Sequence, residues 1–531
     1  MIILLIWIAV LIAVIIIYLR QIYSRFSKYD VKYDMPIPLL GNMATVLLRQ
    51  KHMADDVLDL YRKYPEERFV GRFEFFNELV MIRDLDLVKK ITVKDFEYFL
   101  DHRSIFSESN SFFSRNLFAL KGQEWKDMRS TLSPAFTSSK IRAMVPFMVE
   151  VGDQMIAKLK KDLAESMDDY ITVDCRDLTT RYATDVIASC AFGLKVDSHT
   201  NQENEFYASA KASSSFGFRQ MLMFFLMMNL PKVAKFFKWD FLSSSAKDFF
   251  KNLVLDTMKE RNEKHIIRPD MIHLLMEAKK GKLTHESVKN DDVAAGFATV
   301  EESTVGTKEV NRVWTDQDLI AQAVLFFIAG FETASSSMCF LLYELAVNPD
   351  IQDRLAKEIR EHHAQNDGKF NFNTIQNMTY LDMVTSELLR LWPPGIVLDR
   401  QCNKDYNLGK ANKNATKDFI IKKGTGIGIP AMGFHRDPKY FPNPEKFDPE
   451  RFSDKNKHNI NPFAYMPFGI GPRNCIGSRF ALCELKAITY FLLLHMEVSP
   501  SETTCIPAKL STESFNLRMV GGSVFRFSLR P

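Results

Sequence analysis

The sequence lacks the cysteine pattern of a disulfide-rich or zinc-binding protein. Its seven cysteines are widely spaced, their number is odd, and no Cys-x-x-Cys pair occurs. Disulfide scaffolds and structural zinc sites normally show even numbers or close pairs of cysteine. We therefore expect free thiols in a reducing compartment, most of them in small buried side chains.

The chain also lacks an excess of charge of one sign. Its 69 Lys and Arg residues nearly balance 65 Asp and Glu residues, which leaves a formal net charge of +4. A dedicated nucleic-acid-binding protein normally carries a stronger basic excess, so no nucleic-acid partner is expected. Internal repeats and low-complexity tracts are absent as well. With 46% apolar residues among 531, the chain can form a sizeable core.

One long apolar run is present, at the N-terminus. Residues 2–19 are apolar without interruption, and four basic residues follow: Arg20, Arg25, Lys28 and Lys32. A cleaved signal peptide would need a basic start, a shorter apolar stretch and a small-residue cleavage site. The pattern instead predicts an uncleaved membrane anchor over residues 1–20, with the rest of the chain in the cytosol. A basic and proline-rich linker is expected over residues 21–42.

The remaining residues, 43–531, show a mainly helical pattern without a convincing domain break. Strands are expected near residues 69–83, near residues 394–430 and in the C-terminal tail. The longest predicted helix spans residues 315–347, and Asn348-Pro349 ends it. Because Gln, Glu and a central Gly interrupt its apolar sequence, a buried central helix explains it better than a second membrane span. The fold class is therefore mainly α with small β-sheets.

Two other segments need an interpretation. Residues 216–239 are rich in Phe and Met with Lys and Arg between them. This composition fits either the packing of two core helices or an apolar lip that dips into the membrane. Residues 286–314 are polar and contain two glycines, which predicts an exposed loop between helices.

The strongest chemical signal is a glycine-rich loop around one cysteine, residues 468–477, directly before a helical pattern that begins at Ser478. A cysteine at a helix start lies near N–H groups that favour the thiolate, and a thiolate in such a loop suits ligation of haem iron. A nucleophilic Cys475 with a distant His base, or a simple buried thiol, are the alternatives. A dinucleotide-binding loop is excluded because the last glycine of that pattern is replaced by Asn474.

This loop resembles the haem-thiolate signature of the cytochrome P-450 family at every fixed position. The resemblance extends over nearly the whole chain and implies the cytochrome P-450 fold, with haem b as cofactor and O2 as cosubstrate. It implies that Cys475 is the iron ligand and that Phe468 packs beside the sulfur. It also implies that Arg473 pairs with a haem propionate.

Other segments support the same resemblance. Trp125 and Arg129 form the family's W-x-x-x-R pattern, and their side chains share one helix face. The resemblance implies that both reach the propionates, together with Arg400. Arg103 is a further candidate for that role.

The predicted long helix contains Gly330, Glu332 and Thr333 in its middle. A glycine there costs about 1 kcal/mol relative to alanine, and a carboxylate in an apolar stretch needs a reason. A kink with one polar residue in a crevice would explain both. The resemblance implies instead that Gly330 makes room for dioxygen and that Glu332 and Thr333 relay protons during oxygen activation.

Three further residues are assigned a structural role. Glu387 and Arg390 lie on one helix face, and Arg451 follows in a segment typical of the family. By resemblance the three form a buried network behind the haem.

The resemblance implies a membrane-anchored monooxygenase of the endoplasmic reticulum that acts on hydrophobic small molecules. Electrons would come from NADPH through cytochrome P-450 reductase, with cytochrome b5 as a second possible partner. The pattern is most similar to insect microsomal members of the ninth numbered family, for which detoxification of plant compounds and insecticides is expected. Oxidation of a hormone or pheromone, a haem-thiolate isomerase and a non-catalytic haem sensor or carrier are the alternatives. Five segments would contact substrate: residues 106–118, 216–225, 326–333, 395–398 and 514–517.

Overall fold

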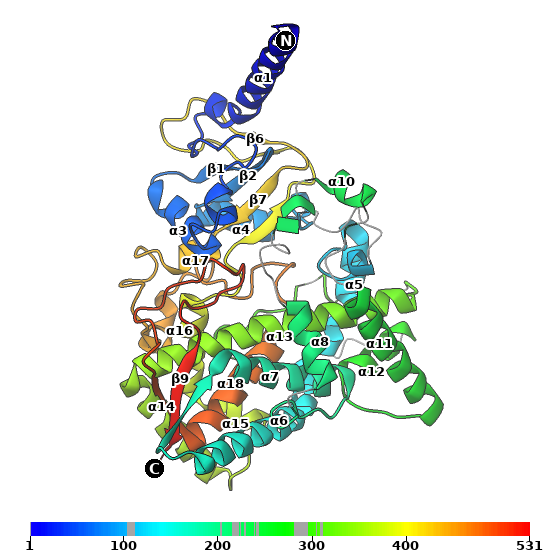
Figure 1. The fold of residues 1–531 in the computed structure, drawn as a ribbon, viewed down its shortest axis with the longest axis vertical. Coiled ribbons are helices and arrows are strands. Elements are labelled where there is room, and N and C mark those ends of the chain that lie inside the picture. The colour runs from blue at the N-terminus through cyan, green and yellow to red at the C-terminus, as the bar shows by residue number, and fades with distance from the viewer. Residues whose placement is uncertain are drawn as a thin grey trace.

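The computed structural model describes residues 2–103, 112–201, 204–214, 222–223, 225–227, 230–237, 239, 244–280, 296–303, 305–307 and 312–530. Helices dominate, and the strands gather mainly near the N-terminal end of the molecule (Figure 1). The principal helices are α1 (Ile2–Tyr23), α3 (Met53–Lys63), α5 (Gly122–Leu132), α6 (Ser138–Glu165), α7 (Cys175–Ile187), α8 (Glu205–Ser214), α10 (Pro231–Phe236), α11 (Ser244–Lys264), α12 (Met271–Lys279), α13 (Asp316–Val347), α14 (Pro349–Gln365), α16 (Thr379–Leu391) and α18 (Ser478–His495). Shorter helices are α2 (Ala44–Leu47), α4 (Leu85–Lys89), α15 (Phe372–Asn377) and α17 (Ala431–His435). The predicted class, mainly α with small sheets, is confirmed.

The strands of the described residues form small sheets at the places that the sequence predicts, with one addition. The four-stranded sheet has the order β1 (Phe69–Glu74), β2 (Asn77–Ile82), β7 (Gly426–Ile429), β4 (Leu398–Gln401). The two-stranded sheet pairs β5 (Tyr406–Asn407) with β6 (Ile420–Ile421). The three-stranded sheet has the order β3 (Tyr170–Asp174), β9 (Val524–Leu529), β8 (Met496–Pro500). Strand β3 was not predicted, because its half-exposed residues pair only with the distant β9.

The long central helix α13 follows its predicted limits. Thr315 caps it: the Thr315 hydroxyl accepts from the Asp318 N–H, and the Asp318 carboxylate accepts from the Thr315 N–H at 2.8 Å. Such reciprocal bonds satisfy N–H groups that have no partner inside the helix. The helix packs along α7 and crosses the helical part of the molecule (Figure 1). This position places the middle of α13 against the cavity described below.

The N-terminal helix α1 projects from one end of the molecule (Figure 1). Most of its described apolar side chains are exposed, whereas Leu19 and Tyr23 in its last turns are buried. The Tyr23 ring packs edge-on against Phe73 at 5.0 Å, which fixes this end of α1 to the first sheet. By length and composition, one helix among the described residues could cross a membrane, and that helix is α13, with 67% of its most apolar window buried. The anchor over residues 1–20 therefore stays a prediction.

Several predicted segments lie partly outside the described residues. These are residues 106–111, 216–221 and 224 of the expected substrate segments, residues 216–221, 224, 228, 229 and 238 of the expected lip, and residues 286–295, 304 and 308–311 of the expected loop.

Candidate active site

A cavity of about 520 Å³ lies where α13, α5 and the loop before α18 meet. Apolar residues such as Phe136, Leu325 and Phe326 form much of its wall. Seven predicted site residues also line it: Trp125, Arg129, Thr333, Arg400, Phe468, Arg473 and Cys475. Tertiary folding thus brings together segments that lie far apart in the sequence.

The loop that carries Cys475 is held by its own backbone. The Cys475 N–H donates to the Phe468 carbonyl at 2.8 Å. Gly469 and Gly471 have φ values of 78° and 74°, which disfavour a side chain. At Gly471 a Cβ atom would lie 1.9 Å from the carbonyl oxygen of Thr92, so glycine is required there. Glycine is therefore needed in this loop for two reasons. Gly469 and Gly471 have a left-handed backbone, and Gly471 lies too close to the Thr92 carbonyl to carry a side chain.

The Cys475 side chain is exposed toward this cavity. Burial by the surrounding protein raises the pKa of its thiol, although the Gly477 N–H and the Arg129 charge oppose this. Burial thus opposes the stabilisation of the thiolate that the helix start provides. A bound metal cation would favour the thiolate.

Two buried arginines, Arg400 and Arg473, make another part of the cavity wall cationic. Burial lowers the pKa of Arg400, and burial together with the Arg400 charge lowers the pKa of Arg473 well below its usual range. The nearest carboxylate to Arg473 is Asp101, at 3.6 Å. Buried cations without close counter-charges are costly. The wall is therefore suited to an anionic ligand group.

Most donors of these arginines are oriented by backbone carbonyls. Arg473 donates to the carbonyls of Leu100 and Leu120, both at 2.8 Å, and its guanidinium lies 4.0 Å from the centre of the Trp125 ring. Arg400 donates to the carbonyl of Asp399 at 2.7 Å. These neutral acceptors fix the direction of each guanidinium, whereas its charge is balanced only in part, by Asp399 at Arg400 and by Asp101 and Asp399 at Arg473.

Arg129 and Arg103 have different surroundings. The Arg129 guanidinium binds both carboxylate oxygens of Glu302, at 3.1 and 2.7 Å, and two oxygens of Asn474, each at 2.8 Å. Arg103 pairs with Glu74 at 2.6 Å and does not belong to the cavity wall. The candidate role of Arg103 at the propionates is therefore wrong, because the β1 carboxylate already binds it.

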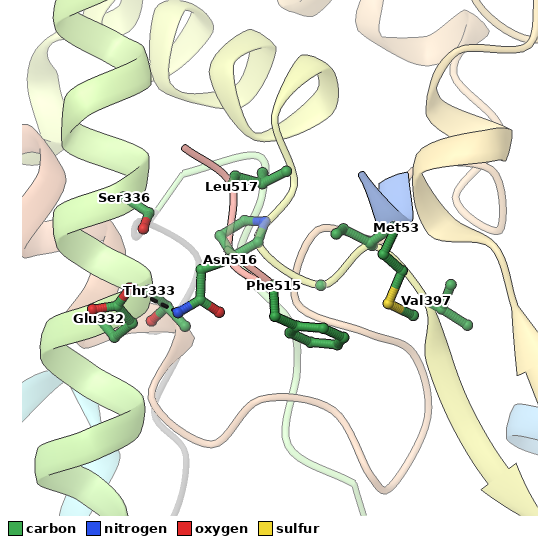
Figure 2. A pocket seen from close by; sticks show the side chains of 11 residues that line it. Met53, Glu332, Thr333, Ser336, Val397, Phe515, Asn516 and Leu517 are labelled. Carbon is green, nitrogen blue, oxygen red and sulfur yellow. Dashed lines mark hydrogen bonds between the residues drawn. The ribbon is translucent and has the colours of Figure 1, made fainter. Parts of the chain in front are cut away.

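Thr333 faces the large cavity, and its hydroxyl donates to the Ala329 carbonyl at 2.6 Å. Glu332 instead lines a second cavity of about 140 Å³. Figure 2 shows the Asn516 side chain reaching the Glu332 carboxylate, to which it donates at 2.8 Å. Arg176 of α7 donates to both carboxylate oxygens at 2.7 Å. The predicted pair is thus divided between two cavities, of which Thr333 lines both.

Gly330 lies on the same stretch of α13 and lines the large cavity. A Cβ atom there would lie 2.7 Å from the Cδ1 atom of Ile187. The glycine therefore permits the close packing of α7 against α13 as well as space beside the cavity.

Comparison with known proteins identifies the family. A sequence profile described as Cytochrome P450 matches residues 32–524. The chain belongs to the cytochrome P450 family. It is 44% identical over 512 residues to cytochrome P450 9e2 of Blattella germanica, covering 94% of this chain and 93% of the relative. It is 43% identical over 506 residues to probable cytochrome P450 9f2 of Drosophila melanogaster, covering 94% and 93%. Cytochrome P450 6k1 of Blattella germanica is 34% identical, with 98% and 95% covered.

These findings confirm the resemblance to the ninth numbered insect family and establish the enzyme class. The protein is a cytochrome P450 monooxygenase, and its cofactor is haem b with O2 as cosubstrate. As in the rest of the family, electrons come from a redox partner and the substrates are hydrophobic.

The residues of the large cavity fit haem b. Cys475 offers a sulfur ligand for the iron, while Arg400 and Arg473 offer cationic partners for two carboxylates. Apolar side chains such as Phe326 and Val397 suit the faces of a flat ring. The cavity therefore supplies each type of group that this cofactor needs from a cytochrome P450.

The predicted network behind the site is confirmed. Arg390 and Glu387 are both fully buried and bind at 2.7 Å, and Arg451 donates to the same carboxylate at 3.3 Å. Arg390 also donates to the His435 carbonyl at 2.7 Å, and the His435 ring accepts from the Met466 N–H at 2.8 Å. This chain of bonds connects α16 to the start of the Cys475 loop, which is a structural role.

The expected substrate segments are placed in part. The large cavity is lined by residues 117–118 of the first segment, 326, 329, 330 and 333 of the third, and 395, 397 and 398 of the fourth. Residues 515–517 of the last segment line the small cavity. Sequence reasoning missed the contributions of α6, α7 and α12, made through Met144, Ile187 and Met271. Apolar residues on amphipathic helices carry no local signal that separates a cavity wall from ordinary core.

Proposed function

We propose that Cys475 would supply the thiolate ligand of haem b, and that the enzyme inserts one oxygen atom of O2 into hydrophobic small molecules. The observation that carries this proposal is the Cys475 thiol opening into a cavity whose wall also contains the buried arginines Arg400 and Arg473. When bound, the haem supplies oxygen activation, which thiolate donation assists.

The cationic wall would bind the two haem carboxylates. Arg400 and Arg473 provide the charge, and Trp125 fixes the plane of the Arg473 guanidinium. Arg129 lines the same wall, where it donates to the Asn474 carbonyl. Phe468 holds the Cys475 backbone and packs beside the sulfur position. We assign the catalytic domain to residues 43–531.

We assign proton delivery to Thr333 and Glu332. The Thr333 hydroxyl can hold a proton at the edge of the large cavity, while the Glu332 carboxylate lies behind it in the small cavity. Arg176 and Asn516 keep that carboxylate oriented. A proton would therefore enter through the small cavity and leave at the Thr333 oxygen.

The substrates are proposed to be xenobiotics, including plant compounds and insecticides. Support comes from the size of the cavity and its apolar residues, among them Phe118, Phe326 and Met271. We propose that NADPH–cytochrome P-450 reductase supplies the electrons, with cytochrome b5 as a second donor.

We propose that residues 1–20 anchor the enzyme in the endoplasmic reticulum membrane, with the catalytic domain facing the cytosol and residues 21–42 as the linker. Support comes from the exposed apolar side chains of α1 and of Met35, Ile37 and Leu39. In Figure 1, α10 lies in the half of the molecule from which α1 projects, and it exposes Phe236 beside Lys235. Such a surface fits contact with a membrane.

The deciding experiment is the carbon monoxide difference spectrum of the reduced holoprotein. We expect a strongly red-shifted Soret band in the wild type, its loss in Cys475→Ser, and its retention in the control Cys505→Ser. A Cys475→Ser protein that keeps the red-shifted band would contradict the assignment of the ligand.

A further inference from the structure

A short segment between α12 and α13, residues 296–303, contacts the loop that carries Cys475. We call these residues the 296–303 strap. Asn474, which directly precedes Cys475, donates through its side-chain amide to the Glu301 carbonyl at 2.9 Å. No site residue predicted from the sequence lies in this segment, so its contacts need an explanation of their own.

The first end of the strap is fixed to α16 and α18. The Phe297 N–H donates to the Asp382 carboxylate at 3.0 Å, and Lys486 pairs with the same carboxylate at 2.7 Å. Gly296 has a φ of 114°, and a Cβ atom on it would lie 2.0 Å from an Asp382 oxygen. Only glycine allows the backbone to come this close.

Aromatic packing holds the next residue. The Phe297 ring lies 5.2 Å from the Phe452 ring and 5.6 Å from the Tyr465 ring. Phe452 belongs to the segment that contributes Arg451 to the buried network, and Tyr465 immediately precedes the Cys475 loop. Aromatic pairs at these distances attract each other beyond the burial of their area, so they stabilise this part of the strap.

The other end of the strap binds Arg129. Glu302 accepts from the Arg129 Nε and Nη2 groups, at 3.1 and 2.7 Å, in a bidentate ion pair. Arg129 is 3% exposed and Glu302 23% exposed, so solvent screens this pair only in part. Arg129 donates onward to the Asn474 carbonyl and side-chain oxygen, each at 2.8 Å.

The edge of the Arg129 guanidinium formed by Nε and Nη2 is therefore occupied by Glu302. One guanidinium joins the strap on one side to Asn474 on the other, and Asn474 is covalently linked to Cys475. Loss of the Glu302 charge would leave a buried guanidinium with fewer acceptors and free to change its orientation.

We propose that Glu302 is a positioning residue that acts through Arg129 and Asn474 to hold the Cys475 loop in the shape needed for sulfur ligation. This inference rests on the proposed role of Cys475. The strap is thus bound to Asp382 at its first end and to Arg129 through Glu302 at its other end.

The test compares Glu302→Gln with Glu301→Gln in the full-length holoprotein. Both substitutions remove one negative charge from the strap without changing its backbone. Glu301 is exposed, and its carbonyl, not its carboxylate, takes part in the contacts above. Two rates are measured during mild heating: the loss of the red-shifted Soret band of the reduced carbon monoxide complex, and the loss of helical circular dichroism.

For Glu302→Gln we expect the Soret band to be lost about fivefold faster than in the wild type, as for a partly screened charged hydrogen bond. The rate at which Glu302→Gln loses helical circular dichroism should stay unchanged. Glu301→Gln should match the wild type in both rates. Equal behaviour of the two variants, or parallel acceleration of both rates in Glu302→Gln, would overturn the proposal. A wild type without a red-shifted band would instead refute the ligand assignment itself.

Discussion

Thr333 lies at the boundary of two cavities, and this position decides what its hydroxyl can do. It lines the large cavity beside Cys475 and also the small cavity that contains Glu332. Its hydroxyl donates to the Ala329 carbonyl at 2.6 Å, and its lone pairs can accept a hydrogen bond from the small cavity. In the proposed relay the hydroxyl would release the Ala329 bond and give its own proton to the large cavity as it accepts one from the small cavity.

Thr333→Ala should uncouple electron use from product formation. We expect product formed per NADPH consumed to fall roughly tenfold or more, since a positioned proton donor commonly contributes at least that much. The measurement is the ratio of product and hydrogen peroxide to NADPH with the reductase present. Ser337→Ala, one turn along α13 on the same cavity, is the matched control and should stay coupled. Equal coupling in both variants would contradict the assignment of proton delivery to Thr333.

Asp185 of α7 is a buried acid that should make stability depend on pH. Burial raises its pKa from 3.8 to about 7, against the Ser198 N–H and hydroxyl that donate to it at 2.8 and 3.0 Å. The folded protein therefore holds one more proton than the unfolded chain between these values. The stabilising contribution is complete below pH 3.8 and is lost as pH rises through about 7.

Asp185→Asn should remove this dependence while keeping the Ser198 hydrogen bonds. From about pH 5 to about pH 8 we expect the variant to gain roughly 3 kcal/mol relative to the wild type. The thermal midpoints of both holoproteins across this range provide the measurement. A constant difference between the two midpoints would show that Asp185 has an ordinary pKa.

Among the elements, the Cys475 loop depends most on close backbone packing. The loop is packed against the turn that contains Thr92, where Gly471 meets the Thr92 carbonyl. A side chain at this point would push the loop away from the Thr92 backbone. Haem retention should therefore be sensitive to a single methyl group.

Gly471→Ala should abolish haem binding, because its Cβ atom would lie 1.9 Å from a backbone oxygen. Gly424→Ala is the matched control, since its φ of 90° is also positive but no atom lies within 4 Å of the added carbon. We expect the control to lose about 1–2 kcal/mol of stability and to keep its haem. The measurement is haem per polypeptide after purification, and equal haem content in the two variants would contradict the steric argument.

For the whole molecule, the proposed membrane attachment depends on the contrast between two apolar helices. Helix α1 is exposed along most of its length, and residues of its last turns, including Leu19, Ile22 and Tyr23, pack against the body. The buried apolar residues of α13, in contrast, pack against other helices of the same chain. This difference in exposure fits a core role for α13 and supports the proposal that α1 contacts the membrane.

Removal of residues 2–18 should release the enzyme from membranes into a salt-extractable form. Because Leu19 and Tyr23 remain, the first sheet should stay packed and the carbon monoxide spectrum should be retained. Membrane fractionation before and after a salt wash measures the release. A truncated protein that still requires detergent would show that other surfaces, such as Phe236 and Phe237 of α10, suffice for insertion.

The sequence by itself determined the features in which the interacting groups are neighbours along the chain. The glycines around Cys475, the Thr315 cap of α13 and the Glu387–Arg390 pair are all of this kind, and each has the predicted geometry. Local spacing sets such contacts, because a turn or a helix brings the same offsets together in every protein.

Only the tertiary structure decided which distant groups meet these elements. Glu332 meets Arg176 and Asn516, which are 156 and 184 residues away, and it lines the small cavity, whereas Thr333 lines both cavities. Arg129 meets Glu302, 173 residues away, in a segment with no motif of its own. A carboxylate or guanidinium looks the same in the sequence whatever its partner, and burial makes the choice of partner decisive for its charge and orientation.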